Sequence, residues 1–435
     1  MREMKDSNVN WLNTIPCDWA LSRIKYVLNE RIEKNDPIKT KDILSLTAKQ
    51  GVVPLSEKEG GGNKPKEDFT AYKLAYPNDI VINSMNILSG SVGLSKYFGC
   101  VSPVYYMLRP FNDNFDVRYF NYIFQTKVFQ LSLFGLGNGI LIKESGNGKF
   151  NTIRMRIPME KFGNLLIPVP NEKEQIKISN YLDTQCSEID ATAEDIQKEI
   201  SLLEDYKKSV ITEAVTKGLN PDAEMKDSGV KWLPKIPKHW KVIPSKYLFA
   251  NSDIRRQTGD EQLTASQKYG IITQKDYTAK ENAQIVLATQ GLEKWKHVEP
   301  NDFIISLRSF QGGLEMSKIT GCITWHYVVL KAQKKVYHKY YKWLFKSARY
   351  INALQGTCNF IRDGQDLRFS NFALVPLFEL PLEEQQQIAD YLDTKCSEID
   401  TLIADKKRQL DILADYKKSL IYEYVTGKKE VPVNE

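Results

Sequence analysis

The 435-residue sequence lacks the patterns on which metal-binding, secreted and membrane-spanning proteins depend. Its six cysteines include no Cys-x-x-Cys pair, and its four histidines are scattered, so no zinc site with short ligand spacings is predicted. No run of about 18 uncharged apolar residues occurs, and the opening MREMKDSNVNW has no apolar core of the secretory type. We therefore expect a cytoplasmic protein that binds no metal and whose cysteines are buried thiols.

Motifs for chemistry on nucleotides or nucleic acids are also missing. The sequence contains no Gly-x-x-x-x-Gly-Lys-Ser/Thr phosphate loop and no Asn/Asp-Pro-Pro-aromatic loop of an adenine methyltransferase. Residues 134–139, FGLGNG, carry three glycines, but at the wrong offsets for a loop that binds a methyl donor. They also follow a helical stretch rather than a strand. We interpret this segment as a flexible loop and expect no catalytic residues.

What the sequence does contain is an internal duplication. Residues 4–16 (MKDSNVNWLNTIP) match residues 225–237 (MKDSGVKWLPKIP), with an offset of 221. Residues 181–190 (YLDTQCSEID) match residues 391–400 (YLDTKCSEID) at nine positions in ten, with an offset of 210. Similarity falls between these matched ends. Each half is therefore a variable domain followed by a well-matched segment, and the interior of the second copy is 11 residues shorter.

The well-matched segments are predicted to be long helices. From Glu174 to Lys217 there is no proline or glycine, and Gly218 followed by Pro221 is typical of a helix end. The second copy covers residues 384–429. Apolar residues recur every seven positions, which predicts a coiled coil, although lysines interrupt the pattern at 207, 406 and 417. The predicted coiled-coil seam contains Leu182, Ile189, Ile196, Leu203, Leu392, Ile399, Leu410 and Leu413.

A helix of this length needs a partner for its apolar stripe. Forty-four residues extend over about 65 Å, so most of such a helix cannot pack against one compact domain. The internal copy supplies a second long helix, and we expect the two to pair antiparallel across a pseudo-twofold axis. A coiled coil formed with an outside protein is the alternative.

The variable domains are predicted to be of the α/β class. Apolar, β-branched and aromatic runs bounded by Gly, Pro or Asn predict strands at 74–84, 99–109, 297–307 and 321–331. A shorter amphipathic helix is predicted around 118–131 and around 339–351 in the two halves. The predicted fold class is α+β, with two tandem α/β domains separated by two long helices that form an antiparallel coiled coil. The predicted segments are residues 1–165, 166–220, 221–375 and 376–435.

The excess of basic residues lies outside the predicted long helices. The chain carries a net charge of +6, whereas residues 174–217 carry −5 and residues 384–429 carry −1. This leaves +12 on the other 345 residues, which form the variable domains and their connections. A basic excess shared by two domains predicts a polyanionic partner held by two surfaces.

Basic and polar side chains in the predicted loops are candidates for contact with DNA. Lysine mostly contacts phosphate, whereas Arg, Asn and Gln can also hydrogen-bond to base edges. The loops after residues 78–82 and 301–305 start at the same point of the repeat but differ in residue type, as expected for two different half-sites. For each candidate, a solvated surface side chain is the alternative. The predicted DNA-binding residues are Lys66, Asn83, Ser84, Asn86, Lys96, Lys143, Arg154, Arg156, Arg255, Arg256, Lys275, Arg308, Ser309, Gln311, Arg362 and Arg368.

The order of these elements resembles the specificity subunit of type I restriction–modification systems. Trp-Leu-x-x-Ile-Pro opens both halves, at 11–16 and 232–237, and the runs EQIKISNYLD (174–183) and EQQQIADYLD (384–393) look like that family's helix starts. The resemblance covers essentially the whole chain. It implies that each variable domain recognises one half of a bipartite site in double-stranded DNA. It also implies that the helix pair sets the gap between the halves and docks two methyltransferase subunits.

The resemblance further implies that this chain is itself non-catalytic and binds no cofactor. S-adenosylmethionine and ATP are expected on partner subunits, which would methylate adenine and, where restriction/motor subunits are present, cut DNA. The expected setting is the cytoplasm of a bacterium or archaeon, associated with the nucleoid through DNA. Two other functions stay open: a self-sufficient DNA methyltransferase or nuclease, and a coiled-coil scaffold that binds no DNA.

Overall fold

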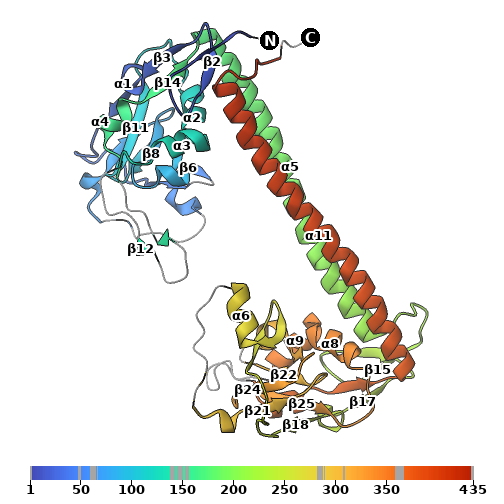
Figure 1. The fold of residues 1–435 in the computed structure, drawn as a ribbon. Coiled ribbons are helices and arrows are strands. Elements are labelled where there is room, and N and C mark those ends of the chain that lie inside the picture. Colours follow the sequence, from blue (N-terminus) through green and yellow to red (C-terminus); the bar gives the residue numbers. More distant parts are fainter. Residues whose placement is uncertain are drawn as a thin grey trace. The chain divides into compact units, whose positions relative to one another are not determined.

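The computed structural model describes residues 2–47, 50–58, 65, 67–137, 143–144, 150–151, 156–281, 288, 290–306, 309–357 and 367–432, with the backbone alone at 143, 144, 150, 151, 310 and 311. These residues form two compact units (Figure 1). Unit 1 comprises Met1–Ile196 and Arg408–Glu435, and unit 2 comprises Gln197–Lys407. Each unit contains one variable domain and a part of each long helix. The four segment boundaries drawn from the sequence stay a prediction.

The variable domain of unit 1 begins with short strands, continues with short helices, and ends with a strand before the long helix. Its strands are β1 (Met4–Asp6), β2 (Thr14–Pro16), β3 (Ala20–Arg23), β4 (Leu28–Arg31), β5 (Leu44–Thr47), β6 (Gly51–Pro54), β7 (Lys73–Ala75), β8 (Ile80–Asn83), β9 (Val92–Leu94), β10 (Gly99–Val101), β11 (Tyr105–Pro110), β12 (Lys143–Glu144), β13 (Phe150–Asn151) and β14 (Leu166–Val169). Its helices are α1 (Ile24–Val27), α2 (Val117–Gln125), α3 (Lys127–Ser132) and α4 (Met159–Gly163), with short 3-10 turns η1 (Leu55–Glu57), η2 (Phe69–Ala71) and η3 (Ile87–Ser89).

Unit 2 repeats this order of elements. Its strands are β15 (Met225–Asp227), β16 (Lys235–Pro237), β17 (Lys241–Ile243), β18 (Phe249–Ser252), β19 (Leu263–Ser266), β20 (Gly270–Thr273), β21 (Lys296–Val298), β22 (Phe303–Ile305), β23 (Glu315–Met316), β24 (Gly321–Ile323), β25 (Val328–Ala332) and β26 (Leu377–Glu379). Its helices are α6 (Gln274–Glu281), α7 (Ser309–Gly312), α8 (His338–Lys346), α9 (Ala348–Gln355) and α10 (Phe369–Ala373), with the 3-10 turns η4 (Ser245–Tyr247) and η5 (Leu292–Lys294).

The two units share one sheet topology. A four-stranded antiparallel sheet has the order β4-β11-β8-β9 in unit 1 and β18-β25-β22-β23 in unit 2. The smaller pairs correspond as well, with β5–β6 matching β19–β20, β7–β10 matching β21–β24, and β3–β14 matching β17–β26. The duplication seen in the sequence is therefore a duplication of the fold.

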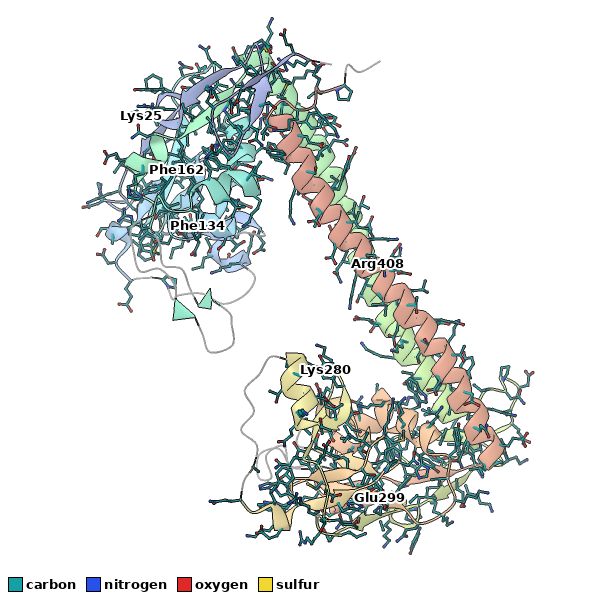
Figure 2. All side chains as sticks on the ribbon, viewed as in Figure 1. Lys25, Phe134, Phe162, Lys280, Glu299 and Arg408 are labelled. Atoms are coloured by element: carbon teal, nitrogen blue, oxygen red, sulfur yellow. The ribbon has the colours of Figure 1, made fainter. Side chains whose placement is uncertain are left out.

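Both faces of each four-stranded sheet are buried. In β8, Ile80 and Ile82 pack into the core formed with α2 and α3, whereas Val81 between them packs with residues of β5 and β6. Alternate side chains of a strand point to opposite faces, so the continuous apolar run of β8 is what a strand covered on both sides requires. Aromatic rings fill the helix side, where the ring centroids of Phe124 and Phe162 lie 5.4 Å apart. Phe162 is labelled in Figure 2.

The structure divides each predicted strand run into two strands of different sheets. The predicted strand at 74–84 is β7 followed by β8, because the backbone turns at Asn78, whose φ is +67°. The Asp79 carboxylate closes this turn by accepting a hydrogen bond of 2.9 Å from the backbone N–H of Tyr76. Asn301 and Asp302 form the same turn in unit 2, between β21 and β22. The sequence signal marked strand-forming residues but not the turn.

Each predicted amphipathic helix is also two helices. Thr126 separates α2 from α3, and Ser347 separates α8 from α9; both have extended backbone, with ψ of 136° and 140°. Each hydroxyl oxygen accepts a hydrogen bond from a backbone N–H of the next helix, that of Phe129 or Tyr350, at 3.4 Å. This is N-capping, which starts a new helix in a new direction.

The two long helices are α5 (Glu172–Lys217) and α11 (Leu382–Val425), labelled in Figure 1. The helix predicted from Glu174 begins two residues earlier, and it ends at Lys217 as predicted, with Gly218 in the left-handed conformation. The helix predicted at 384–429 covers 382–425. Among the described residues, none of the helices combines the length and hydropathy needed to cross a membrane.

Within each unit the two helices pair antiparallel. In unit 1, the hydroxyl groups of Tyr181 and Tyr424 lie 3.3 Å apart, and the Lys417 Nζ lies 2.6 Å from the Asp190 carboxylate. In unit 2, Lys207 makes the corresponding ion pair with Asp400 at 2.6 Å, and Lys406 makes a further pair with Glu199 at 2.5 Å. Partner numbers in α11 fall as those in α5 rise. The predicted antiparallel coiled coil is thus present in the part of each helix that belongs to each unit.

The predicted seam positions are all buried or half-buried. Leu182, Ile189, Leu392 and Ile399 are buried, and Ile196, Leu203, Leu410 and Leu413 are half-buried. The three lysines that interrupt the heptad pattern are half-buried, and each reaches an acidic residue of the opposing helix. The long lysine stem can cover apolar surface while its ammonium group reaches solvent and a carboxylate.

Each variable domain is fastened to the first turn of a long helix by a Glu-Gln dipeptide. The Glu174 carboxylate accepts a hydrogen bond of 3.0 Å from the Trp19 indole, and Glu384 accepts one of 3.0 Å from Trp240. The neighbouring amides of Gln175 and Gln385 are buried and hydrogen-bond to domain backbone at 2.8–2.9 Å.

The same domain also holds the end of the other long helix. Tyr119 in α2 donates a hydrogen bond of 2.9 Å to the Val425 carbonyl, which belongs to the last turn of α11. Tyr340 in α8 does the same for Val215 in α5, at 3.0 Å. Both tyrosines are fully buried, and burial raises the pKa of each hydroxyl well above its usual value, so they act as neutral donors. Each domain therefore contacts both helices through satisfied, buried hydrogen bonds.

Candidate nucleic-acid interface

The four-stranded sheet of each unit has two ends, and the predicted DNA-contact residues are located relative to these ends. In unit 1, β4 ends at Arg31, β8 ends at Asn83 and β11 begins at Tyr105; strand register places Tyr105 opposite Asn83. In unit 2, β18 ends at Ser252, β22 ends at Ile305, and β25 begins at Val328 opposite Ile305. We call this end of each sheet the loop end.

Two of the predicted residues in unit 1 shape the loop end from inside. Asn83 and Ser84 are buried. The Asn83 side-chain oxygen accepts a hydrogen bond of 3.1 Å from the Met85 backbone N–H, and the Ser84 hydroxyl donates one of 2.7 Å to the Val104 carbonyl. These side chains stabilise the turn and do not face solvent.

Asn86 and Arg156 are exposed at the same end of the sheet. Arg156 precedes Ile157, whose backbone N–H donates to the Ser84 carbonyl at 3.1 Å, so Arg156 lies at this end of the sheet. Lys96 is exposed as well, but its turn lies at the opposite end, next to Asn78. The structure thus brings Asn86 and Arg156 together and leaves Lys96 apart from them.

In unit 2 the predicted residues divide in the same way. Ser309 is buried, and its hydroxyl oxygen accepts a hydrogen bond of 2.9 Å from the Ser306 backbone N–H. Arg255 and Arg256 are exposed beyond the end of β18, and Arg255 donates to the Lys294 carbonyl at 2.8 Å. Exposed positions are also held by Lys275 on α6 and by Arg368 just before α10.

The remaining predicted residues are not placed as side chains. Lys66, Arg154, Arg308 and Arg362 lie outside the described residues. Only the backbone is described at Lys143 in β12 and at Gln311 in α7.

Arg255, a basic residue at the loop end of unit 2, was predicted from the sequence, but its equivalent in unit 1, Lys34, was missed. Isolated antiparallel bridges join Lys34 to Lys73 in unit 1 and Arg255 to Lys296 in unit 2. Lys34 and Arg255 therefore occupy equivalent positions, and both are exposed. The surrounding segments of the two halves share too little sequence to be aligned by eye, so the equivalence becomes visible only from the strand pairing.

A second basic group in unit 2 lies on the β19–β20 turn. Its Gln267 side chain packs against Gly312 of α7, where a Cβ atom would lie 3.0 Å from the Gln267 Nε2. The next residue, Lys268, donates to Glu281 at 3.0 Å, and its hydrogen bonds with Tyr269 and Glu281 raise its pKa. Lys280, which projects from α6 in Figure 2, lies over the Tyr269 ring at 5.5 Å. Both lysines lie beside the loop end.

A buried His297–Asp260 pair is the arrangement in unit 2 that most resembles part of a catalytic site. The His297 Nδ1 lies 2.9 Å from the Asp260 carboxylate, and its Nε2 lies 3.7 Å from Glu299. The nearby Cys322 is fully buried, and burial raises the pKa of its thiol, which disfavours a nucleophilic thiolate. Neither imidazole nitrogen meets a hydroxyl or thiol in the described contacts. We interpret the pair as structural.

Metal chemistry finds no support in the described part of the chain. No group of three or more His, Cys, Asp or Glu side chains there could hold a metal ion. The five described cysteines are free thiols.

Comparisons with known proteins agree with this arrangement. No family model matches the chain. The putative type I restriction enzyme MjaX specificity subunit of Methanocaldococcus jannaschii is 23% identical over 279 residues, which is 62% of this chain and 60% of that protein. The chain is similar to the specificity subunits of type I restriction–modification systems. The match spans less than two thirds of the curated relative's length.

The chain shares its fold with two solved structures over nearly its whole length. One comes from a study of complex assembly and conformational transition of the type I R-M system; it has a TM-score of 0.65, 12% identity, and coverage of 95% of this chain and 99% of that one. The HsdS subunit from Thermoanaerobacter tengcongensis has a TM-score of 0.50, 13% identity, and coverage of 95% and 98%. The predicted resemblance and the predicted fold class are confirmed.

The position of Lys34 and Arg255 generates a test. We expect Lys34→Ala and Arg255→Ala each to weaken DNA binding and to reduce the slope of log affinity against log salt by about 1, because one phosphate contact is lost. Fluorescence anisotropy with a labelled duplex between low and physiological salt measures this slope.

Matched controls are Lys96→Ala in unit 1 and Lys318→Ala in unit 2, since both lysines are exposed at the opposite end of their sheets. These variants should bind DNA as the unmodified chain does. An equal loss in the control variants would show that the loop end is not the DNA-binding surface.

Proposed function

We propose that this chain is the DNA-recognition subunit of a type I restriction–modification complex. Each unit binds one half of a bipartite site in double-stranded DNA through the loop end of its sheet. The helix pair sets the gap between the half-sites and docks two methyltransferase subunits. Restriction/motor subunits join the complex where they are present.

The observation that supports this proposal most is the duplication of the loop end. Two domains of one topology present exposed basic residues at equivalent positions, Lys34 and Arg255, while the neighbouring loop residues differ in type. Equivalent basic positions suit the phosphate backbone, which is the same in every sequence. Different loop residues suit different base sequences.

A rigid connection between two DNA-reading domains would give them a selectivity that neither domain has alone. A mismatch in a short half-site costs only about 1–3 kcal/mol. When two readers are linked, the second binding step becomes intramolecular and succeeds only if the spacing fits. Helices α5 and α11 contribute to both units without a break, and their interhelical ion pairs favour one register.

The outer faces of the long helices carry a repeated apolar pair that fits a docking role. Leu202 and Tyr206 on α5 are 69% and 51% exposed, and their repeat counterparts Ile412 and Tyr416 on α11 are 61% and 51% exposed. Residues four apart lie on one helix face, so each pair forms one small patch. One patch falls in each unit. Two equivalent patches suit two copies of one partner, the methyltransferase subunit.

Replacing one patch should remove one partner. We expect Leu202→Glu with Tyr206→Glu to leave a complex with one methyltransferase subunit, because a charge at each position cannot be desolvated in an apolar contact. Light scattering of the purified complex measures its mass. The matched control is Leu402→Glu, at a residue of α11 that is 51% exposed and whose repeat counterpart is Thr192. A full complex with the double variant would contradict docking at these patches.

The chain is proposed to be non-catalytic and to act in the cytoplasm. S-adenosylmethionine and ATP are assigned to the partner subunits, since this sequence carries neither the methyltransferase nor the phosphate-loop motif. A self-sufficient methyltransferase or nuclease and a scaffold without DNA are the alternatives. Methylation or cleavage of DNA by the purified chain alone would establish the first, and absence of salt-dependent DNA binding even with the methyltransferase partner would favour the second.

Domain exchange tests the proposed function directly. Replacing residues 29–164 with the corresponding domain of another specificity subunit should change one half of the methylated motif and leave the other half intact. Replacing residues 250–374 should do the reverse. Methylation mapping of genomic DNA from cells that carry each chimera, together with the same methyltransferase, identifies the motif. A chimera that changes both halves would refute the independence of the two readers.

A further inference from the structure

Trp325 is the one exposed tryptophan among the seven, all of which lie in the described part of the chain. Half of its side-chain surface is accessible. The others are buried or half-buried, and several donate their indole N–H within the fold, as Trp19 and Trp240 do. A large aromatic ring left in water forgoes the stabilisation that burial gives, and tryptophan is a residue type enriched at binding interfaces.

The ring is held in place by its surroundings. Trp325 lies in the turn between β24 and β25, closed by a hydrogen bond of 3.0 Å from the Tyr327 N–H to the Thr324 carbonyl. Its indole stacks on the imidazole of His326, with ring centroids 3.5 Å apart and planes inclined by 29°. A preorganised ring loses little conformational freedom on binding.

Strand register places this turn at the loop end beside basic residues. Ile323, the last residue of β24, pairs with Lys296, which in turn bridges to Arg255. The turn leads directly into Val328, the first residue of β25, opposite the end of β22. Arg255 and Lys294 are exposed. The aromatic ring therefore lies next to the positive charge that suits a polyanion.

We propose that Trp325 stacks against a base step of the DNA half-site bound by unit 2. This inference rests on the proposed function. Basic side chains nearby would hold the phosphates, and the flat indole would insert beside one base and partly unstack the step, as apolar side chains do in several complexes with double-stranded DNA. The corresponding residue in unit 1 is Pro103, which has no aromatic ring. The stacking contact thus belongs to one half-site only.

The test uses the full chain with its methyltransferase partner and a duplex carrying the motif found by methylation mapping. We expect Trp325→Ala to lower the affinity for this duplex by about 5- to 100-fold, the range expected for one stacked base, and Trp325→Phe to retain most of it. Replacing single adenines with 2-aminopurine should report a fluorescence change on binding in the unit 2 half-site, and Trp325→Ala should abolish that change.

Tyr247→Ala is the matched control. Tyr247 is 55% exposed in the same unit, but it precedes β18, which places it at the opposite end of the sheet. This variant should bind the duplex normally. Unchanged affinity and fluorescence with Trp325→Ala would overturn the inference, and so would a loss of methyltransferase binding with DNA affinity retained, which would assign the ring to a protein contact. Failure of the unmodified complex to bind the duplex would instead refute the proposed function.

Discussion

The arrangement of each unit depends on the hydrogen bonds that fasten a domain to the long helices. Gln175 and Gln385 are buried, and each amide satisfies one backbone donor and one backbone acceptor of its own domain. A buried amide left without partners costs about 1–3 kcal/mol, so the geometry that satisfies it is favoured over rotated alternatives. The indole–glutamate bond beside it and the tyrosine bond to the other helix fix the same orientation at further points. A sheet held in this way presents its loop end in one direction relative to its helices.

The ion pairs between the two long helices favour one register of the coiled coil. Asp190–Lys417 and Lys207–Asp400 are equivalent ion pairs, because Asp190 corresponds to Asp400 and Lys207 to Lys417 in the repeat. Exposed pairs of this kind contribute at most about 1 kcal/mol each, so their value lies in choosing between registers rather than in stability. The Lys406–Glu199 pair has no such counterpart, because Ile196 and Gln409 occupy the repeated positions. The two copies of the repeat therefore contribute equivalent apolar seams, but the Lys406–Glu199 ion pair occurs once.

Much of the fold follows from signals that are local or repeated. The heptad pattern predicts both long helices and their antiparallel pairing, because a continuous apolar stripe with one internal copy leaves few other solutions. The turns at Asn78 and Asn301 and the caps at Thr126 and Ser347 escape the same approach, because apolar periodicity continues across them while the backbone changes direction. In each case a single polar side chain, not the pattern around it, decides where an element ends.

The sequence predicted that the candidate DNA-binding surface is basic, but not where its individual side chains lie. Composition places the basic excess on the variable domains, and the repeat places Asn86 and Ser309 at equivalent loops. It does not reveal that Ser84 and Ser309 point inward, that Lys96 lies at the opposite end of its sheet, or that Lys34 and Trp325 lie at the loop end. Those facts depend on strand register, which a single weakly similar pair of copies does not determine.

The most direct measurement of the central claim is the length of the DNA gap in a chain with shortened helices. Removing one heptad from both α5 and α11 shortens each helix by about 10 Å, which is about three base pairs of duplex, and keeps the apolar seam in phase. Methylation mapping should then find both half-sites unchanged and the gap between them shorter by up to about three base pairs. A control in which the same heptads are exchanged for other heptads of equal length should keep the original gap. An active, methylating variant with shortened helices and an unchanged gap would contradict the account.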